Sequence, residues 1–133
     1  MKNLTFNKAE KLKSRKSIES LFRSGQSVSS PPFKLLYRKA EFSDYPAKMT
    51  VAIPKKLIRK AVERNLLKRR TREAYRQYKN LVYKELRKGQ PKSFEMVFLY
   101  QSKDIADYQS IKRAVNVLLI RFLENQKLTG SNI

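Results

Sequence analysis

The sequence predicts an α+β fold, an α/β sandwich in which helices pack against a small sheet, and the order of its segments carries this prediction. Apolar residues recur at helical spacing at 14–24, 60–87 and 108–122. Short strand-like segments lie before and after the long central helix. The order is therefore helix, two strands, helix, strand, helix. A strand on each side of a long helix indicates a βαβ crossover with a parallel strand pair.

The first helix is expected to begin after Ser14, whose hydroxyl can cap the first turn. Its apolar face consists of Ile18, Leu21 and Phe22, which are three and four residues apart. Gly25 stands where a residue in the left-handed conformation commonly ends a helix. We therefore expect the helix to end there.

Two strands are expected next, at 33–38 and 49–53, because apolar residues alternate with others in both segments. The SSPP segment at 29–32 is expected to be an extended connector, since proline disfavours helix in the residue before it. The polar stretch 41–48 is expected to join the two strands as a hairpin loop. The apolar run EMVFLY at 95–100 is the remaining strand.

The central helix is long and strongly basic. One buried stripe is expected along it, consisting of Leu67, Thr71, Ala74, Tyr78 and Leu81. The opposite side carries a basic arc about 100° wide on a helical projection. The arc consists of Asn65, Lys68, Arg69, Arg72, Arg76 and Lys79. The closing helix, with an apolar face from Tyr108 to Phe122, is expected to begin after Asp107, a second cap.

The charge of the chain is strongly positive and unevenly placed. Lys and Arg number 31 against 11 Asp and Glu, so the formal net charge is +20. Residues 55–88 hold fourteen basic and three acidic side chains, net +11, and residues 1–24 a further +5. A solvated charged face is the ordinary alternative, but only Glu63 and Glu73 lie near enough to pair with the arc. The sequence therefore predicts a surface that binds a polyanion.

Residues that the chain lacks exclude several classes of enzyme. The sequence contains no Cys and no His, which removes thiolate nucleophiles, the metal sites that these residues form and the commonest general base. The 3 glycines are too scattered for a phosphate-binding loop, and the acidic residues are too dispersed for two-metal hydrolysis. No apolar run approaches the roughly 18 residues of a membrane span. We expect a cytoplasmic protein without a catalytic site of its own.

The length of 133 residues fits one domain, which we place at 1–123, with a polar tail at 124–133 that is expected to fray. The aromatic residues allow two interpretations. Phe22, Phe33 and Tyr37 are either core residues or an exposed platform on which unpaired bases stack, and the sequence favours neither. Three tyrosines are assigned to the core with the hydroxyl at its rim, and they are Tyr75, Tyr78 and Tyr108.

The stretch KKLIRKAVERNLLKRRTREAYR at 55–76 closely resembles the signature of the bacterial ribonuclease P protein family. In that family a lysine pair after a strand leads into a helix that carries Arg-Asn-Arg and then Lys-Arg and Arg-Glu. The N-terminal LKSRKSIESLFRSG and the strand FKLLY agree as well, so the resemblance covers residues 4–123. It implies an αβββαβα sandwich whose βαβ crossover is left-handed, against the usual rule.

The resemblance implies a protein that assists a catalytic RNA in removing the 5′ leader from precursor tRNA by endonucleolytic cleavage. Its partners would be the ribonuclease P RNA and the single-stranded leader, within a ribonucleoprotein in which the protein is a monomer and no small-molecule cofactor is needed. Mg²⁺ would be held chiefly by the RNA. The residues implied to contact this RNA are Arg64, Asn65, Lys68, Arg69, Arg72 and Arg76. Those implied to bind the leader are Phe22, Phe33, Leu35, Tyr37, Lys55 and Lys56.

The sequence departs from the family pattern at two positions. Leu66 stands where the family usually has the second Arg of Arg-Asn-Arg, and Arg70 could compensate from about 120° away around the helix. Ile18 stands at a position that is commonly aromatic. Two rival functions stay open from the residues alone. One is a ribosomal or general structural RNA-binding protein with no processing role, and the other is a protein that binds anionic membrane surfaces.

Overall fold

The computed structural model describes residues 8–41, 45–88 and 92–131, and it forms an α+β fold with a four-stranded sheet. In chain order the elements are η1 (Lys8–Glu10), α1 (Arg15–Ser24), β1 (Gln26–Ser30), β2 (Phe33–Ala40), β3 (Ala47–Ala52), α2 (Ala61–Leu86), β4 (Ser93–Tyr100) and α3 (Tyr108–Ser131). The predicted fold class and the αβββαβα order are confirmed. Alternation of residue types alone missed β1, because this mostly exposed edge strand is polar except for Val28.

The strand order is β1-β2-β4-β3. β4 pairs antiparallel with β2 and parallel with β3, so the predicted parallel pair on either side of α2 is confirmed. The predicted hairpin between β2 and β3 is wrong, because β4 lies between them. Five of the eight β4 side chains are apolar and buried, and such a strand is most stable at the centre of a sheet. Part of the predicted loop, 42–44, lies outside the described residues.

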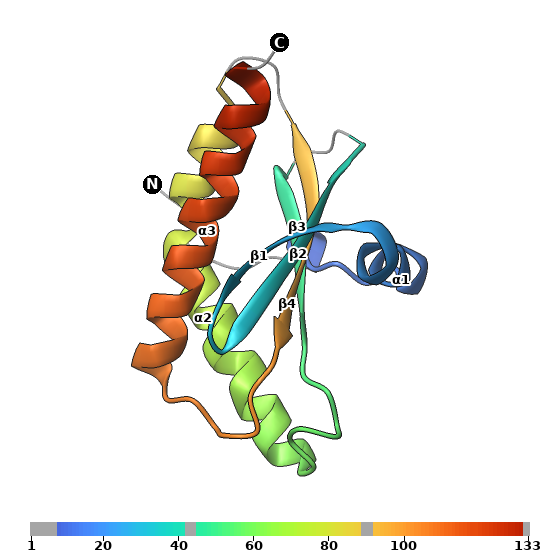
Figure 1. Cartoon of the computed structure of the whole chain (residues 1–133), viewed down its shortest axis with the longest axis vertical. Coiled ribbons are helices and arrows are strands. Elements are labelled where there is room, and N and C mark those ends of the chain that lie inside the picture. Colours follow the sequence, from blue (N-terminus) through green and yellow to red (C-terminus); the bar gives the residue numbers. More distant parts are fainter. Residues whose placement is uncertain (1–7, 42–44, 89–91, 132–133) are drawn as a thin grey trace.

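The sheet separates two unequal layers (Figure 1). α2 and α3 cover one face together, whereas α1 lies alone on the opposite face. The main core fills the space under α2 and α3, and its largest fully buried side chains include Phe33, Met96, Phe98, Tyr75 and Phe122. The smaller core under α1 consists of Leu12, Leu21, Leu36 and Val97. One sheet face is thus filled by the protein itself, while the other is only partly covered.

α1 begins as predicted, because the Ser17 amide donates to the Ser14 hydroxyl oxygen at 3.2 Å. The role of Gly25 differs from the prediction. Its φ of −71° and ψ of 153° are extended and open to any residue. A Cβ at this position, however, would lie 2.6 Å from the carbonyl oxygen of Leu21. Glycine is required here by a close approach and not by a left-handed turn.

α2 runs from Ala61 to Leu86, close to the predicted bounds, but its buried side differs from the predicted stripe. Leu67, Thr71 and Ala74 are buried as expected, whereas Leu81 is 68% exposed. The buried residues include a series spaced by four, namely Leu67, Thr71, Tyr75, Lys79 and Tyr83, together with Ala74, Val82 and Leu86. Each step of four residues turns about 40° beyond a full circle, so the buried side winds around the helix along its length.

Lys79, predicted on the exposed basic arc, is therefore turned into the protein. Its ammonium group contacts both carboxylate oxygens of Glu10, at 2.7 and 2.9 Å, and both side chains are buried. The Tyr83 hydroxyl donates to the same carboxylate. This ion pair ties the N-terminal segment to α2, and Lys11 forms a parallel bridge with Met49 beside it.

Most of the segment 124–133, which we placed in a polar tail, belongs to α3, and its fraying stays a prediction. α3 continues to Ser131, and residues 132–133 lie outside the described part of the chain. The Asn125 side-chain amide donates to the Tyr37 hydroxyl at 3.1 Å. A polar helix end held in this way carries no apolar periodicity, which is why the sequence pattern missed it.

Candidate nucleic-acid interface

The N-terminal half of α2 presents the predicted basic side chains on one side. Asn65 and Arg69 are exposed, and three half-buried neighbours, Lys68, Arg72 and Arg76, lie beside them. The same helix buries Leu67 and Thr71 on its far side, so packing against the core fixes the direction in which the arc faces. Within the described residues, no ion pair engages Lys68, Arg69 or Arg72. These three cations are available to an external anion.

Arg76 is already partly neutralised inside the protein. Its Nε donates to Glu73 at 3.1 Å, and Gln77 donates to the same carboxylate. The hydrogen bond from Arg76 has the largest effect in lowering the pKa of Glu73, and the bond from Gln77 lowers it further. The same bond from Arg76 to Glu73 raises the pKa of Arg76. Of the predicted RNA-binding side chains, Arg76 therefore offers less net charge than Arg69 or Arg72.

Arg64 has a structural role that the sequence did not suggest. Its guanidinium Nη1 donates to the carbonyl oxygens of Ile58, at 3.0 Å, and Arg59, at 2.7 Å. These bonds hold the loop between β3 and α2 against the start of the helix. The loop carries Lys55 and Lys56, both exposed. The structure thus brings the lysine pair and the basic arc to the same end of α2.

Arg70 likewise faces the protein. Its Nη1 donates to the carbonyl oxygen of Ala106 at 2.7 Å, in the loop that leads into α3. The next residue, Asp107, caps α3 as predicted by accepting a bond from the Ser110 amide at 2.8 Å. That hydrogen bond is the main reason why the pKa of Asp107 is lowered. Because Arg70 is bound to this loop, it does not replace the arginine that the family usually has at the position of Leu66.

Three of the predicted leader-binding residues are in the core. Phe33, Leu35 and Tyr37 are 1%, 0% and 2% exposed, because their strand positions face α2 and α3. This is a correction of the platform interpretation, since buried rings have no face to offer a base. Phe22, in contrast, is 48% exposed on α1. Tyr75, predicted in the core with its hydroxyl at the rim, is fully buried, and burial raises the pKa of its hydroxyl.

The opposite sides of the same strands form a surface that the sequence reasoning missed. Side chains alternate along β2, so Lys34 and Leu36 point toward α1 and away from the main core. α1 covers the centre of this face, where Leu36 pairs with Val97. The next row consists of Lys34, Leu99 and Ala52, which are paired neighbours in the sheet and only half-buried. We call this row the open strip.

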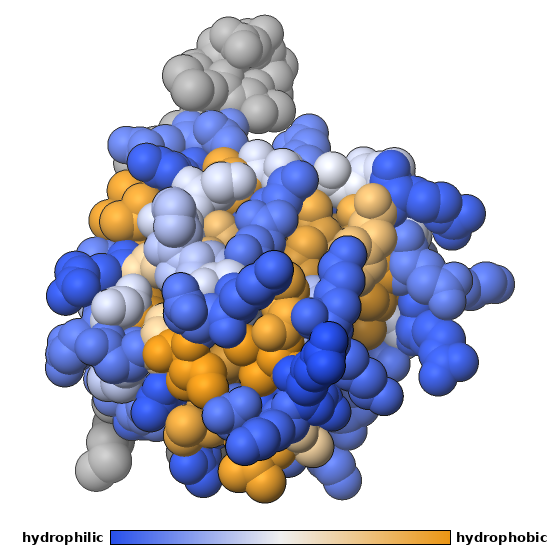
Figure 2. All heavy atoms as spheres, turned by 60° about the horizontal axis from the view of Figure 1, so that its bottom comes forward, coloured by the Kyte–Doolittle hydropathy of each residue, from blue (hydrophilic) through white to orange (hydrophobic). Residues whose placement is uncertain are grey.

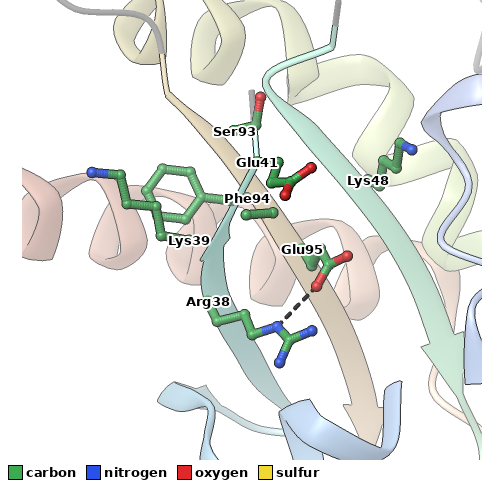
Figure 3. Close-up of a pocket in the computed structure, with 8 residues that line it drawn as sticks. Arg38, Lys39, Glu41, Lys48, Ser93, Phe94 and Glu95 are labelled. Atoms are coloured by element: carbon green, nitrogen blue, oxygen red, sulfur yellow. Dashed lines mark hydrogen bonds and ion pairs between the residues drawn. The ribbon is translucent and has the colours of Figure 1, made fainter. Parts of the chain in front are cut away.

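A pocket lies near each end of the sheet. Near the open strip, a cavity of about 360 Å³ is lined by Ser29, Pro31, Pro32, Phe33, Gln101 and Ser102. On the other side of α1, a cavity of about 540 Å³ is lined by Arg38, Lys39, Ala40, Glu41, Lys48, Ser93, Phe94 and Glu95 (Figure 3). There the Arg38 Nε donates to Glu95 at 2.9 Å, and the Arg38 guanidinium also contacts Ser20 of α1. Charges of both signs therefore line this second cavity.

The structure also bears on two other kinds of site. In the described residues, no three Asp, Glu, His or Cys side chains gather as a group able to hold a metal ion. Over the same ranges, no helix has the length and apolar character needed to cross a membrane. The exposed basic face of α2, the lysine pair beside it and the α+β sandwich that supports them define an RNA-binding protein.

Comparison with known proteins identifies the family. The sequence profile of the family described as Ribonuclease P matches residues 6–123. The ribonuclease P protein component of Porphyromonas gingivalis is 33% identical over 120 residues, which cover 90% of this chain and 87% of that protein. The structure of the RNase P protein from Thermotoga maritima superposes with a TM-score of 0.67 at 26% identity, covering 84% of this chain and 96% of that one. The chain belongs to the ribonuclease P protein family.

Proposed function

We propose that this chain, as the protein component of ribonuclease P, binds the ribonuclease P RNA through the N-terminal half of α2. The observation that carries the proposal is a set of cations on this helix, the exposed Arg69 and the half-buried Lys68 and Arg72, that no described acidic residue neutralises. Guanidinium groups match phosphate oxygens in a two-pronged geometry, and Asn65 can donate to and accept from a base or sugar edge. Arg64 acts indirectly here, by holding the loop that carries the lysine pair.

The 5′ leader of precursor tRNA binds, in this proposal, along the open strip. Phe22 is an exposed aromatic side chain on α1, the helix that covers the centre of this sheet face, and Lys34 supplies a positive charge within the strip. Lys55 and Lys56 follow the end of β3, close to Ala52 of the same row. A single strand is well served by such a surface, because its bases stack on rings while lysines neutralise its phosphates. The buried Phe33, Leu35 and Tyr37 support the strip from below.

The chemistry of cleavage belongs to the RNA in this account. Mg²⁺ ions held by the RNA would activate the attacking water and stabilise the leaving oxygen. The protein supplies positioning and positive charge, which raise the affinity for precursor tRNA and lower the Mg²⁺ concentration that the reaction needs. Figure 2, which brings the lower end of Figure 1 forward, shows apolar side chains in the middle of this view with long hydrophilic side chains around and across them. Such a mixed surface suits contact with both bases and phosphates.

The salt dependence of RNA binding tests whether the basic face of α2 contacts the ribonuclease P RNA. The variant is Arg69→Gln/Arg72→Gln, and its matched control, Lys84→Gln/Lys88→Gln, removes two exposed cations near the other end of α2. For binding of the ribonuclease P RNA, log K decreases as log salt rises, and this negative slope should become shallower by about 0.7 to 0.9 for each lost phosphate contact. The control should keep the wild-type slope. Equal slopes for the wild type and the arginine variant would overturn the assignment of this face.

A broad RNA-binding role without tRNA processing is the rival outcome. RNA that copurifies with the tagged protein after a wash at raised salt distinguishes the two. The proposal expects one dominant structured noncoding RNA together with 5′-extended tRNAs. A broad ribosomal RNA profile would contradict it.

A further inference from the structure

A second basic surface lies on the N-terminal segment and α1. Five of its exposed cations are Lys8, Lys13, Arg15, Lys16 and Arg23, and we call this set the α1 basic surface. Two acidic residues occur in the same segment. One of them, Glu10, is fully buried and bound by Lys79, so it does not neutralise the surface. Glu19 is the acidic residue of this segment that remains exposed.

These cations have no internal use in the structure. Over the described ranges 8–41, 45–88 and 92–131, none of the five forms an ion pair. Arg15, Glu19 and Arg23 are spaced four residues apart on α1, yet no salt bridge joins them. Several like charges within one short helix and its leading segment repel each other unless an anion lies against them.

The position of the surface separates it from the face that α2 presents. α1 stands on the side of the sheet opposite α2 and α3 (Figure 1). The sheet lies between α2 and the cations that α1 itself carries, Arg15, Lys16 and Arg23, whereas Lys8 and Lys13 precede this helix. A phosphate bound on one surface therefore cannot contact the other, and a single straight RNA strand along α2 leaves the α1 basic surface unused.

The chemistry favours RNA over a membrane as the occupant. A helix that lies on a membrane needs a broad apolar face toward the lipid. The apolar side chain of Leu21 packs against the sheet and is fully buried. Phe22 is the large apolar side chain that α1 leaves exposed. The outer side carries Arg15, Lys16 and Arg23, which suit the phosphate backbone of a nucleic acid.

We propose that the α1 basic surface binds the phosphate backbone of a second segment of the ribonuclease P RNA, distinct from the segment on α2 and from the leader. The inference rests on the proposed function, because it takes place in the same ribonucleoprotein. The protein then bridges two RNA segments across the thickness of its sheet. Contacts to phosphates carry no sequence information, so this surface fixes the geometry of the RNA and does not read its bases.

Localised cleavage of the RNA tests the inference directly. The chain contains no cysteine, so Ser24→Cys on α1 and Gln77→Cys on α2 each create one attachment site for an iron–EDTA probe. Both positions are exposed. Hydroxyl radicals from each probe cut nearby RNA in the reconstituted holoenzyme without precursor tRNA. The inference expects cuts from position 24 in a segment separate from the cuts made from position 77.

Three other outcomes overturn it. Cuts from position 77 without cuts from position 24 overturn the inference and leave the proposed function intact. Loss of cuts from both positions overturns the proposed function and the inference with it. Cuts from position 24 that coincide with those from position 77 also contradict a second RNA segment.

Charge removal gives an independent measure of the same contact. The variant Arg15→Gln/Lys16→Gln/Arg23→Gln is compared with the control Lys84→Gln/Lys88→Gln/Lys103→Gln, which removes three exposed cations elsewhere. For three lost phosphate contacts, the negative slope of log K against log salt should become shallower by about 2 to 3. Circular dichroism melting shows whether each variant is folded. An unchanged slope in a folded variant would overturn the inference. When the three charges on α1 are removed, the cuts made from position 77 should persist.

Discussion

Replacing Lys79 by methionine removes the partner of a buried carboxylate. In the folded protein Glu10 is fully buried and Lys79 is 3% exposed, with two contacts of 2.7 and 2.9 Å between them. Loss of one member of a buried pair leaves an uncompensated charge and costs about 3 to 5 kcal/mol. The Tyr83 hydroxyl would remain as a donor to Glu10 but cannot replace a full positive charge. For a domain of this size the loss corresponds to a fall in Tm of about 10 to 20 °C.

Urea unfolding followed by circular dichroism measures this loss, and a double variant tests its cause. Glu10→Leu/Lys79→Met removes both charges, so we expect it to recover most of the stability that Lys79→Met loses. Tyr83 keeps the carbonyl oxygen of Ala47, at 3.2 Å, as an acceptor. The salt slope of RNA binding should stay unchanged in folded Lys79→Met, because this side chain does not reach the surface. A single variant within about 1 kcal/mol of the wild type would refute the reasoning, since breaking a buried pair costs more.

Three further predictions concern other elements. Gly25→Ala should destabilise the protein by about 1 to 3 kcal/mol in urea unfolding, because its Cβ would lie 2.6 Å from a backbone carbonyl oxygen. Leu67→Ala should cost about 2 to 5 kcal/mol and Leu81→Ala less than about 0.5 kcal/mol, and equal losses would contradict the observed winding of the buried side of α2. The lowered pKa of Asp107 means that its contribution to stability is present above its unfolded pKa and is lost as pH falls through its folded pKa. Thermal melts at graded acidic pH should therefore show a smaller decline for Asp107→Asn than for the wild type.

The elements that depend on local sequence could be predicted closely. α2 and the Ser14 and Asp107 caps follow from residue spacing and side-chain chemistry, and the structure places them where they were expected. Long-range pairing could not be predicted in the same way. Alternation places residues on a face of a strand, but it does not say which strand is the neighbour, so the insertion of β4 between β2 and β3 was missed.

The candidate site was predicted in part for a related reason. The unneutralised cations Lys68, Arg69 and Arg72 follow from charge and helical phase near the start of α2. Lys79 was misplaced because the buried side winds around the helix, and a fixed face of 3.6-residue period does not follow it. Phe33 and Tyr37 were assigned to the leader, although the sheet turns them into the core and leaves their neighbours facing α1. Which face of a strand becomes buried is decided by packing of elements distant in sequence.

The open strip has its own test, which separates its role from that of the basic face of α2. Phe22→Ala/Lys34→Gln alters the aromatic face and the charge beside the open strip, and Leu81→Ala is a control that removes an exposed apolar side chain elsewhere. The first variant should weaken holoenzyme binding of precursor tRNA while its affinity for the ribonuclease P RNA changes little. Equal affinity of the variant and the control for precursor tRNA would remove the strip from the account.

The central claim is that the protein enables the holoenzyme to recognise the leader, and one measurement tests it most directly. Two affinities are measured, one for a precursor tRNA and one for the same tRNA without its leader. Each is measured for the ribonuclease P RNA alone and for the holoenzyme reconstituted from the RNA and the protein. The account predicts that the protein raises affinity for the precursor and leaves that for mature tRNA nearly unchanged. An equal gain for both RNAs would contradict it, because the protein would then act as a general phosphate clamp.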